Sequence, residues 1–334
     1  MKTLFIGLNW LGDVIMSLPA MLAAAERHEV HVLTRPHLVE AYQIIDRFAA
    51  VHAVATNGPI FAGLQKMRKL RKEGFDQIVV LPDSLRAALV SWACDAPSIG
   101  YNTQGRKLFL SQAIAKPGNF KEIHESTLHF NLVKEAGLAD QQPPLPDICF
   151  DRSRVVETVR RFALEPDEPF IILAPGAAFG AAKRWPPEKF AEVAEIIENR
   201  YPGLKILVSG SEAEQEIAQK TGARCNSVKS LAGKTSLTEL AVLLSHAKAL
   251  IANDSGTMHL AALFRLPAII PVGPTDMART GALSEKTVYV YGSEKCPQAP
   301  CRLKTCPRAD HICMNSVSAE RIAEVFSQMV GQSL

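Results

Sequence analysis

The strongest constraint on the fold is the alternation of short apolar segments with longer helix-like segments along the chain. In the first half we expect strands at residues 3–8, 31–34, 51–56 and 77–81. Helices are expected at residues 14–27, 37–48, 61–73, 84–93 and 130–136. Because this alternation at this spacing is typical of βαβ units, the first half predicts a parallel sheet covered by helices.

The same alternation restarts after a proline-rich segment, Gln-Gln-Pro-Pro-Leu-Pro at residues 141–146. Strands are expected at residues 170–174, 205–209, 249–252, 267–272 and 288–291. Helices are expected at residues 154–162, 189–200, 212–220, 237–246 and 319–330. Proline at that density favours an extended connector. We therefore predict an α/β chain of two Rossmann-like domains, residues 1–145 and 150–334, facing a central cleft.

Composition narrows the class of protein. A chain of 334 residues is longer than one core usually holds, and 47% hydrophobic with 21% charged residues is typical of a globular protein. The net charge of +3 does not indicate nucleic acid, but it allows an acidic partner or an anionic membrane surface. Asp13 and Pro19 interrupt the only signal-like stretch, and seven cysteines do not fit a disulfide framework. We expect a cytoplasmic protein.

A strand, a polar turn and a helix follow one another at residues 249–263. The strand ends at residue 252 and the helix opens at Thr257. A turn of this kind leaves backbone N–H groups free at a helix N-terminus, where they and the helix dipole attract phosphate. Asp254 follows the strand at its carboxyl end, where open α/β sheets bind ligands.

Side chains of the same turn fit either of two roles. Ser255 can cap the helix, Gly256 lets the backbone approach a ligand, and His259 lies close enough to reach the same anion. The alternative is an ordinary turn whose serine and aspartate serve only as caps. The residues alone leave both interpretations open.

A loop of small residues follows the expected strand at 170–174. It carries Lys183 and Arg184 and leads into a helix started by Pro186 and Pro187. Small residues allow a ligand to lie against bare backbone, and the cations could neutralise phosphate. The loop lacks the ending of a Walker A motif. A surface loop with a solvated lysine is the alternative.

Two further turns carry acidic residues. After the strand at 205–209, Ser209 and Gly210 precede Glu212 and Glu214, either of which could bind ribose hydroxyls or serve as a first-turn acid. After the first strand, Gly12 and Asp13 form another turn. There we favour Asp13 as a helix N-cap over a general base facing the cleft.

Four of the seven cysteines cluster near the C-terminus, at positions 296, 301, 306 and 313, with His311 among them. Structural zinc sites usually show closely spaced cysteine pairs, which this spacing lacks. We therefore predict a loop of reduced thiols without stoichiometric zinc.

Three motifs together resemble a known family. They are residues 9–17 (Asn-Trp-Leu-Gly-Asp-Val-Ile-Met-Ser), 175–186 (Pro-Gly-Ala-Ala-Phe-Gly-Ala-Ala-Lys-Arg-Trp-Pro) and 253–262 (Asn-Asp-Ser-Gly-Thr-Met-His-Leu-Ala-Ala). The chain resembles the bacterial lipopolysaccharide heptosyltransferases of glycosyltransferase family 9, and most closely the heptosyltransferase II group. The resemblance covers nearly the whole chain.

The resemblance implies a GT-B fold and an inverting transfer of L-glycero-D-manno-heptose from ADP-heptose, which is a substrate, with no cofactor or metal required. The acceptor would be the first heptose of the inner core, Hep-Kdo2-lipid A. Asp13 would be the base, Lys183 would bind donor phosphate and Glu214 the ribose. The other implied donor-binding residues are Gly12, Gly176, Ser209, Gly210, Asp254, Ser255, Gly256, Thr257, Met258 and His259.

One departure from the family concerns the loop before Lys183. Some members have phosphate-binding threonines where this chain has Ala178 and Phe179, so backbone N–H groups would have to replace them. Closure of an N-terminal acceptor domain on a C-terminal donor domain would bring Asp13 and Lys183 together and exclude water. Alternatives are a related sugar transferase with another acceptor, or a non-enzymatic nucleotide- or metal-binding protein.

An acceptor anchored by lipid A implies peripheral contact with the cytoplasmic face of the inner membrane. Basic residues gather in the first half, five of them on one expected helix: Lys66, Arg68, Lys69, Arg71 and Lys72, with Arg106 and Lys107 further on. Such a cluster on a helix must partly face solvent. It fits an anionic lipid surface or a plain solvated face.

Overall fold

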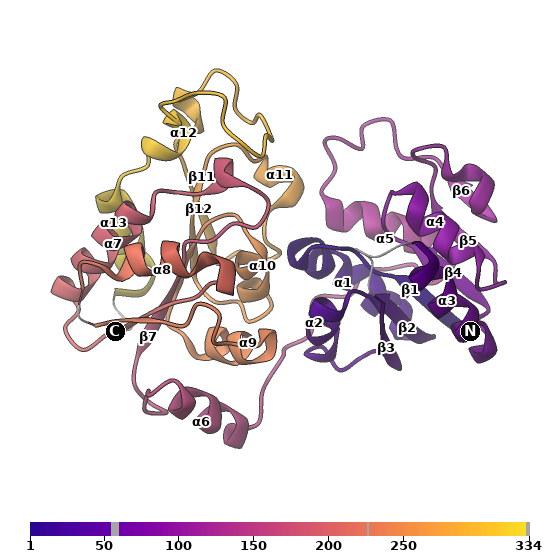
Figure 1. Ribbon diagram of the computed structural model, residues 1–334, viewed down its shortest axis with the longest axis horizontal. Helices are drawn as coiled ribbons and strands as arrows, with labels where there is room; N and C mark the ends of the chain where they lie inside the picture. Colours follow the sequence, from indigo (N-terminus) through magenta and orange to yellow (C-terminus); the bar gives the residue numbers. More distant parts are fainter. Residues whose placement is uncertain (55–59, 226, 332–334) are drawn as a thin grey trace. The chain divides into compact units, whose positions relative to one another are not determined.

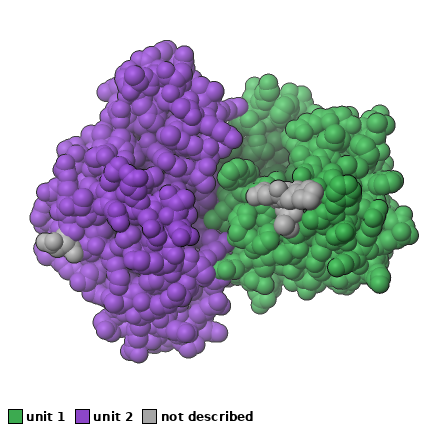
Figure 2. Space-filling model, in the orientation of Figure 1, with its two compact units in different colours: residues 1–146, 278–280 green, residues 147–277, 281–334 purple. Residues whose placement is uncertain are grey.

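The computed structural model describes residues 1–54, 60–225 and 227–331. The chain forms two compact units (Figure 2). Unit 1 comprises residues 1–146 and 278–280, and unit 2 comprises residues 147–277 and 281–334. The chain therefore passes from unit 1 to unit 2 after Pro146, at the end of the proline-rich segment.

Unit 1 is built on a six-stranded parallel sheet with the order β3-β2-β1-β4-β5-β6. Its strands are β1 (Lys2–Ile6), β2 (Glu29–Thr34), β3 (Ala50–Ala53), β4 (Gln77–Val80), β5 (Ser98–Tyr101) and β6 (Gln112–Ile114). The four strands expected from the sequence are present, although the end of the third falls outside the described residues. β5 and β6 were not predicted, because they are short and contain Ser98, Gly100 and Gln112 instead of an apolar run.

Helices cover the unit 1 sheet (Figure 1). They are α1 (Leu11–Ala25), α2 (Val39–Gln43), α3 (Ile60–Leu70), α4 (Leu85–Trp92) and α5 (Glu125–Glu135), with shorter 3-10 turns η1 (Pro36–Leu38), η2 (Arg71–Glu73) and η3 (Arg106–Phe109). α1 packs against α5. α3 and α4 cover a core that includes Leu4, Leu33 and Ile78, all nearly inaccessible to solvent.

Three details of unit 1 differ from expectation. α1 begins at Leu11, three residues before the expected residue 14, and continues through Pro19. The expected helix at 37–48 is reduced to η1 and α2, which end at Gln43. α5 begins at Glu125, before the expected residue 130, because the His124 side chain caps it by accepting a hydrogen bond from Ser126 N (3.1 Å).

Unit 2 repeats the architecture, with the parallel order β12-β11-β10-β7-β8-β9. Its strands are β7 (Phe170–Ala174), β8 (Lys205–Val208), β9 (Val228–Ser230), β10 (Leu250–Ala252), β11 (Ala268–Val272) and β12 (Thr287–Tyr291). Its longer helices are α6 (Arg152–Arg161), α7 (Pro187–Arg200), α8 (Gln215–Gly222), α9 (Leu237–His246), α10 (Gly256–Ala262) and α13 (Ala319–Val330). The predicted α/β class with two Rossmann-like units is confirmed.

Both sheets share one topological feature. The first strand of each unit lies in the middle, and strand order reverses between β1 and β4 in unit 1 and between β7 and β10 in unit 2. In open parallel sheets this reversal separates the loops at the carboxyl edge and leaves room for a ligand. Among the residues that the structure describes, no helix is long and apolar enough to cross a membrane.

Candidate active site

Three neighbouring strands of unit 2 end beside one another and carry most of the predicted donor-binding residues. β7 lies between β10 and β8, and Ala174 of β7 pairs with Ala252 of β10 in parallel register. The loops that follow these strands therefore meet at one edge of the sheet, at the point where strand order reverses. They span residues 175–186, 209–214 and 253–256.

The side chain of Asn253 holds both ends of the loop that follows β7. Its Oδ1 accepts a hydrogen bond from Trp185 N (2.9 Å), and its Nδ2 donates to the carbonyl of Pro175 (2.6 Å). Trp185 is itself fully buried and donates from Nε1 to Val317 O (3.1 Å). Asn253 therefore fixes the loop against β10. The sequence does not predict this positioning role of Asn253, because only the folded structure brings residues 175 and 185 to it.

Lys183 and Asp254 form an ion pair across the point of strand reversal. The Lys183 Nζ lies 2.6 Å from Asp254 Oδ2, and both side chains are largely buried, with 16% and 7% exposed. The same ammonium lies 4.9 Å from the centre of the Phe179 ring, a cation–π contact. The interpretation of Lys183 as a solvated surface lysine is therefore wrong.

A second cation reaches this loop from the cysteine-rich segment. Lys304 Nζ lies 5.6 Å from the centre of the Phe179 ring, and the Lys304 carbonyl accepts a hydrogen bond from Ala182 N (3.0 Å). A Cβ at Gly180 would lie 2.3 Å from that carbonyl, so only glycine permits this approach. His311 Nε2 adds a contact to Ala182 O at 2.9 Å. The cysteine-rich segment thus supports the loop, and nothing in the sequence indicated Lys304.

Glu214 links the loop after β8 to the loop after β7. Its Oε2 accepts hydrogen bonds from both N and Oγ of Ser211, each at 2.8 Å, so the first-turn acid interpretation is confirmed as a capping box. A Cβ at Gly176 would lie 2.1 Å from Glu214 Oε1. Gly176 is therefore needed for the carboxylate to lie against the β7 loop. Ser209, which follows β8, is buried, and a Cβ at Gly210 would lie 3.3 Å from Glu214 Cβ.

The turn before α10 differs in detail from expectation. The helix begins at Gly256 with Ser255 in the N-cap position, but the Ser255 side chain makes no capping hydrogen bond. Its buried Oγ finds no hydrogen-bond partner among the described residues. Thr257 is half-buried. The Met258 side chain is fully buried and His259 is only 4% exposed, so Met258 can meet a ligand through its backbone alone.

In unit 1, Gly12 and Asp13 lie in the first turn of α1. The N-cap of this helix is Trp10, so the favoured interpretation of Asp13 as the N-cap is wrong. Asp13 is half-buried and follows β1, the strand beside the reversal point of unit 1. The sheet thus places this carboxylate where α/β proteins present ligand-binding groups.

A pocket of about 100 Å³ lies at the same edge of unit 1. Gly7, Asn9, Arg35, Pro82 and Ser84 are among the residues that line it. Arg35 Nε donates a hydrogen bond to Asn9 Oδ1 (2.7 Å), which joins the loops after β1 and β2. Polar and apolar residues both line the pocket, and its Arg35–Asn9 pair suits a hydroxyl-bearing or anionic group.

Arg106 does not belong to the basic surface expected from the sequence, because its side chain is fully buried. Its Nε donates to Tyr101 O (2.5 Å) and its guanidinium also reaches Pro82 O and Asp83. Lys116 Nζ lies 2.5 Å from the other oxygen of Asp83. Burial lowers the pKa of Arg106, and the contacts fix the loop after β4.

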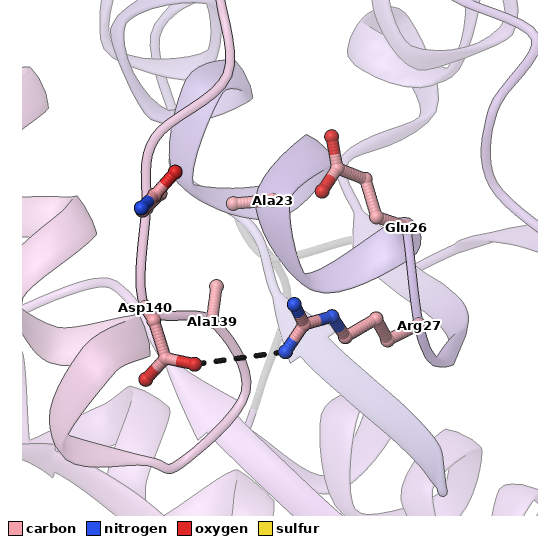
Figure 3. A pocket seen from close by; sticks show the side chains of 6 residues that line it. Ala23, Glu26, Arg27, Ala139 and Asp140 are labelled. Atoms are coloured by element: carbon pink, nitrogen blue, oxygen red, sulfur yellow. Dashed lines mark ion pairs between the residues drawn. The ribbon is translucent and has the colours of Figure 1, made fainter.

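A larger hollow of about 220 Å³ lies at the end of α1 (Figure 3). Arg27 points across it toward Asp140, with Nη1 3.6 Å from Oδ2, and both side chains are mostly exposed. Glu26 and Gln141 also line it. None of the predicted site residues is among the lining residues, so this hollow is not the candidate active site.

Comparison with known proteins decides the family. The family model described as glycosyltransferase family 9 (heptosyltransferase) matches residues 64–311, most of the chain. The chain belongs to glycosyltransferase family 9. It is therefore a glycosyltransferase, and the alternative of a non-enzymatic binding protein is excluded.

Relatives of this family 9 chain carry heptosyltransferase names. It is 28% identical to lipooligosaccharide heptosyltransferase 2 of Haemophilus influenzae, over 87% of this chain and 88% of that protein. It is also 28% identical to lipopolysaccharide heptosyltransferase 2 of Salmonella typhimurium, over 86% of both chains. The structure of Escherichia coli ADP-heptose lipopolysaccharide heptosyltransferase II superimposes with a TM-score of 0.85 at 23% identity, covering 100% of this chain and 99% of that one. That likeness establishes the GT-B fold.

Proposed function

We propose that this enzyme transfers L-glycero-D-manno-heptose from ADP-heptose to the first heptose of a lipopolysaccharide inner core, with inversion at the anomeric carbon. The observation that carries the proposal is the buried Lys183–Asp254 pair at the strand-reversal point of unit 2. It places an ammonium where a parallel sheet receives a nucleotide diphosphate. The relatives named heptosyltransferase 2 support the choice of sugar and acceptor.

Lys183 and Lys304 are assigned to the diphosphate. Both ammonium groups lie over the same Phe179 ring, so two positive charges face the loop that follows β7. A departing ADP carries developing negative charge, which preorganised cations stabilise in a site shielded from water. Two lysines can supply this charge, and we propose that transfer requires neither a metal nor a cofactor.

Asp254 is assigned to the sugar instead of the phosphates. An ionised carboxylate only accepts hydrogen bonds, and it would repel a diphosphate directly. Its pairing with Lys183 fixes the ammonium, and its remaining acceptor sites suit heptose hydroxyls. The orphan Ser255 Oγ next to it offers a further polar contact for the donor.

Glu214 is assigned to the ribose. One carboxylate oxygen is used by the capping box with Ser211, while Oε1 lies against Gly176 on the loop after β7. A carboxylate oxygen that follows the second strand of a Rossmann unit is the group that accepts ribose hydroxyls in nucleotide sites. Gly176 and Gly210 allow the Glu214 side chain to approach both loops closely, and the buried Ser209 begins the loop that carries Glu214.

Asp13 is assigned as the general base that removes the proton from the acceptor hydroxyl. An inverting transfer needs one base on the nucleophile, and Asp13 is the carboxylate of the first βα turn of unit 1. The pocket beside β1 and β4, with Arg35 and Asn9, then serves the acceptor. Unit 1 thus supplies the base and acceptor contacts, and unit 2 holds the donor.

Contact with the cytoplasmic face of the inner membrane is the remaining part of the proposal. Arg68, Lys69, Arg71 and Lys72 on α3 and η2 are exposed. Phe61 on α3, Trp92 on α4 and Leu108 on η3 are exposed apolar residues, at 68%, 67% and 86%. These side chains belong to neighbouring elements, since α3 packs on α4 and α4 on η3. Exposed cations and apolar side chains on neighbouring elements suit an anionic lipid surface.

Mass spectrometry of reaction products tests the proposed function. The enzyme is incubated with ADP-heptose and with delipidated core acceptors that carry no heptose or one heptose. We expect the mass of one heptose to be added only to the acceptor that already carries one. Addition only to the heptose-free acceptor, or to neither, would contradict the proposed step and favour a related transferase with another acceptor.

A further inference from the structure

Two histidines and a glutamate converge on one face of the unit 1 sheet, apart from the residues assigned to catalysis. His31 lies on β2, His52 on the edge strand β3, and Glu73 ends η2 after α3. His31 Nδ1 is 3.2 Å from His52 Nε2 and 3.9 Å from Glu73 Oε2. Among the residues that the structure describes, His31, His52 and Glu73 form a group whose ligand atoms lie close enough together to share one ion.

A fourth residue orients the buried histidine. His31 Nε2 lies 2.8 Å from Glu29 Oε1, and the His31 ring packs edge-on against Phe75 with only 4% of the residue exposed. Because a carboxylate accepts hydrogen bonds, Nε2 carries the proton and Nδ1 keeps its lone pair. That lone pair is directed to the side of His52 and Glu73. A carboxylate behind a ligating histidine is the arrangement that orients metal ligands in proteins.

We propose that His31, His52 and Glu73 bind one divalent transition-metal ion of the zinc class. A tetrahedral zinc with bonds of about 2.0–2.1 Å keeps its ligand atoms roughly 3.3–3.4 Å apart, which matches the two imidazole nitrogens. The Glu73 carboxylate is exposed on a short turn, where its Oε2 needs to approach His31 Nδ1 by roughly half an ångström. All three ligand atoms already lie within 4.8 Å of one another. Imidazole and carboxylate ligands with a water in the fourth position suit this class of ion.

Lys2 competes for the same negative charge. Its Nζ lies 3.1 Å from Glu73 Oε2 and 3.6 Å from Glu29 Oε1. Two carboxylates face this one ammonium, and both attract a cation. An ion must nevertheless draw Glu73 away from Lys2. Replacing Lys2 with a neutral residue should therefore tighten metal binding, which a purely structural cluster does not predict.

The bound ion would act as a cross-link. It would join the edge strand β3 to β2 and to the turn that follows the basic helix α3. An ion that binds only the folded state stabilises it by mass action. Without the ion, a hydrogen bond from His52 Nε2 to His31 Nδ1 joins the two strands instead.

A cobalt titration tests this site and separates it from the cysteine-rich segment. Tag-free, full-length protein is stripped with a chelator, returned to chelator-free buffer and titrated with Co²⁺, whose visible bands report coordination. Thiolate ligands add a charge-transfer band in the near ultraviolet that nitrogen and oxygen ligands do not. We expect one Co²⁺ per chain with visible bands and no thiolate band, displaced by Zn²⁺.

Variants assign the ion to its ligands. His52→Gln and Glu73→Gln should abolish the visible bands, Glu29→Gln should weaken affinity about 10–100-fold, and Lys2→Gln should tighten it. His246→Gln, which changes an exposed histidine of unit 2, is the matched control and should bind normally. Circular dichroism verifies that each variant is folded, and exposed Glu73 keeps the test valid if His52→Gln fails to fold. Absence of binding, or binding that survives both ligand variants, overturns the proposal.

Discussion

Asp13 and Lys183 carry the two halves of the proposed chemistry, one as a base and one as a cation. The two side chains have different surroundings in the structure. Lys183 is held in place by Asp254 and Phe179, whereas Asp13 lies in the first turn of α1 behind an N-cap formed by Trp10. Because Asp13 is not the helix cap, its replacement should affect chemistry more than folding.

Replacement of Asp13 tests its role as base. We expect Asp13→Asn to lower turnover by about 10²–10⁴-fold, the range for loss of a general base, while ADP affinity stays nearly unchanged. Steady-state kinetics and ADP calorimetry on the same preparation make the comparison. Near-full activity in the variant would show that the carboxylate is not the base.

Replacement of Gly176 tests the contact between the loops after β7 and β8. An alanine Cβ would lie 2.1 Å from Glu214 Oε1, so Gly176→Ala must displace the carboxylate from its capping box. We expect a loss of about 1–3 kcal/mol in the free energy of unfolding, measured in urea, together with weaker ADP binding. Gly118→Ala, where an added Cβ meets nothing within 4 Å, is the control. If the two variants bind ADP with equal affinity, Glu214 is not part of the donor site.

At the scale of elements, length and composition decided which parts could be predicted from the sequence. β7, α9 and α13 have the predicted bounds, and β10 differs by one residue, because each is a strong apolar or amphipathic segment between clear turn residues. The unpredicted strands β5, β6 and β9 are three or four residues long and lie at or beside sheet edges. Such segments are defined by pairing with a neighbour more than by their own residues.

The candidate site could likewise be predicted only in part. The motifs at the strand ends predicted Lys183, Asp254 and Glu214 as site residues, because polar residues that follow apolar strands can be identified in the sequence. The pairing of Lys183 with Asp254, the anchoring by Asn253 and the approach of Lys304 were not predictable. Each joins segments that are distant in sequence and meet only through the strand order.

The helix α3 is the element on which the membrane proposal depends. We expect weak binding of the enzyme to anionic vesicles that disappears at high salt. Changing Lys66, Lys69 and Lys72 to Gln removes three cations worth on the order of 1 kcal/mol each near such a surface, so sedimentation with vesicles should be lost. Activity on a delipidated acceptor should stay normal.

A charge-matched control separates this patch from net charge. Lys234, Lys248 and Lys286 are exposed lysines of unit 2, and changing all three to Gln alters the net charge equally. That variant should still sediment with vesicles. If both variants sediment alike, α3 is not the membrane contact.

At the scale of the whole molecule, one topology occurs twice. Each unit places its first strand at the centre of a six-stranded sheet and collects its functional candidates where strand order reverses. Unit 1 presents Asp13 there, and unit 2 presents Lys183 and Asp254. The repeated architecture explains why the sequence predicted the fold class and the strand ends of interest, although each unit's side-chain contacts required the structure.

The central claim is that the reversal point of unit 2 holds the donor diphosphate, and ADP titration of Lys183→Ala tests it most directly. Loss of a desolvated charge-assisted contact is worth about 1.5–3 kcal/mol, so ADP affinity should fall at least about tenfold. Lys304→Ala should show a smaller loss, because that side chain is exposed, and Lys286→Ala should show none. An ADP affinity of Lys183→Ala equal to that of the unmodified enzyme would contradict the account.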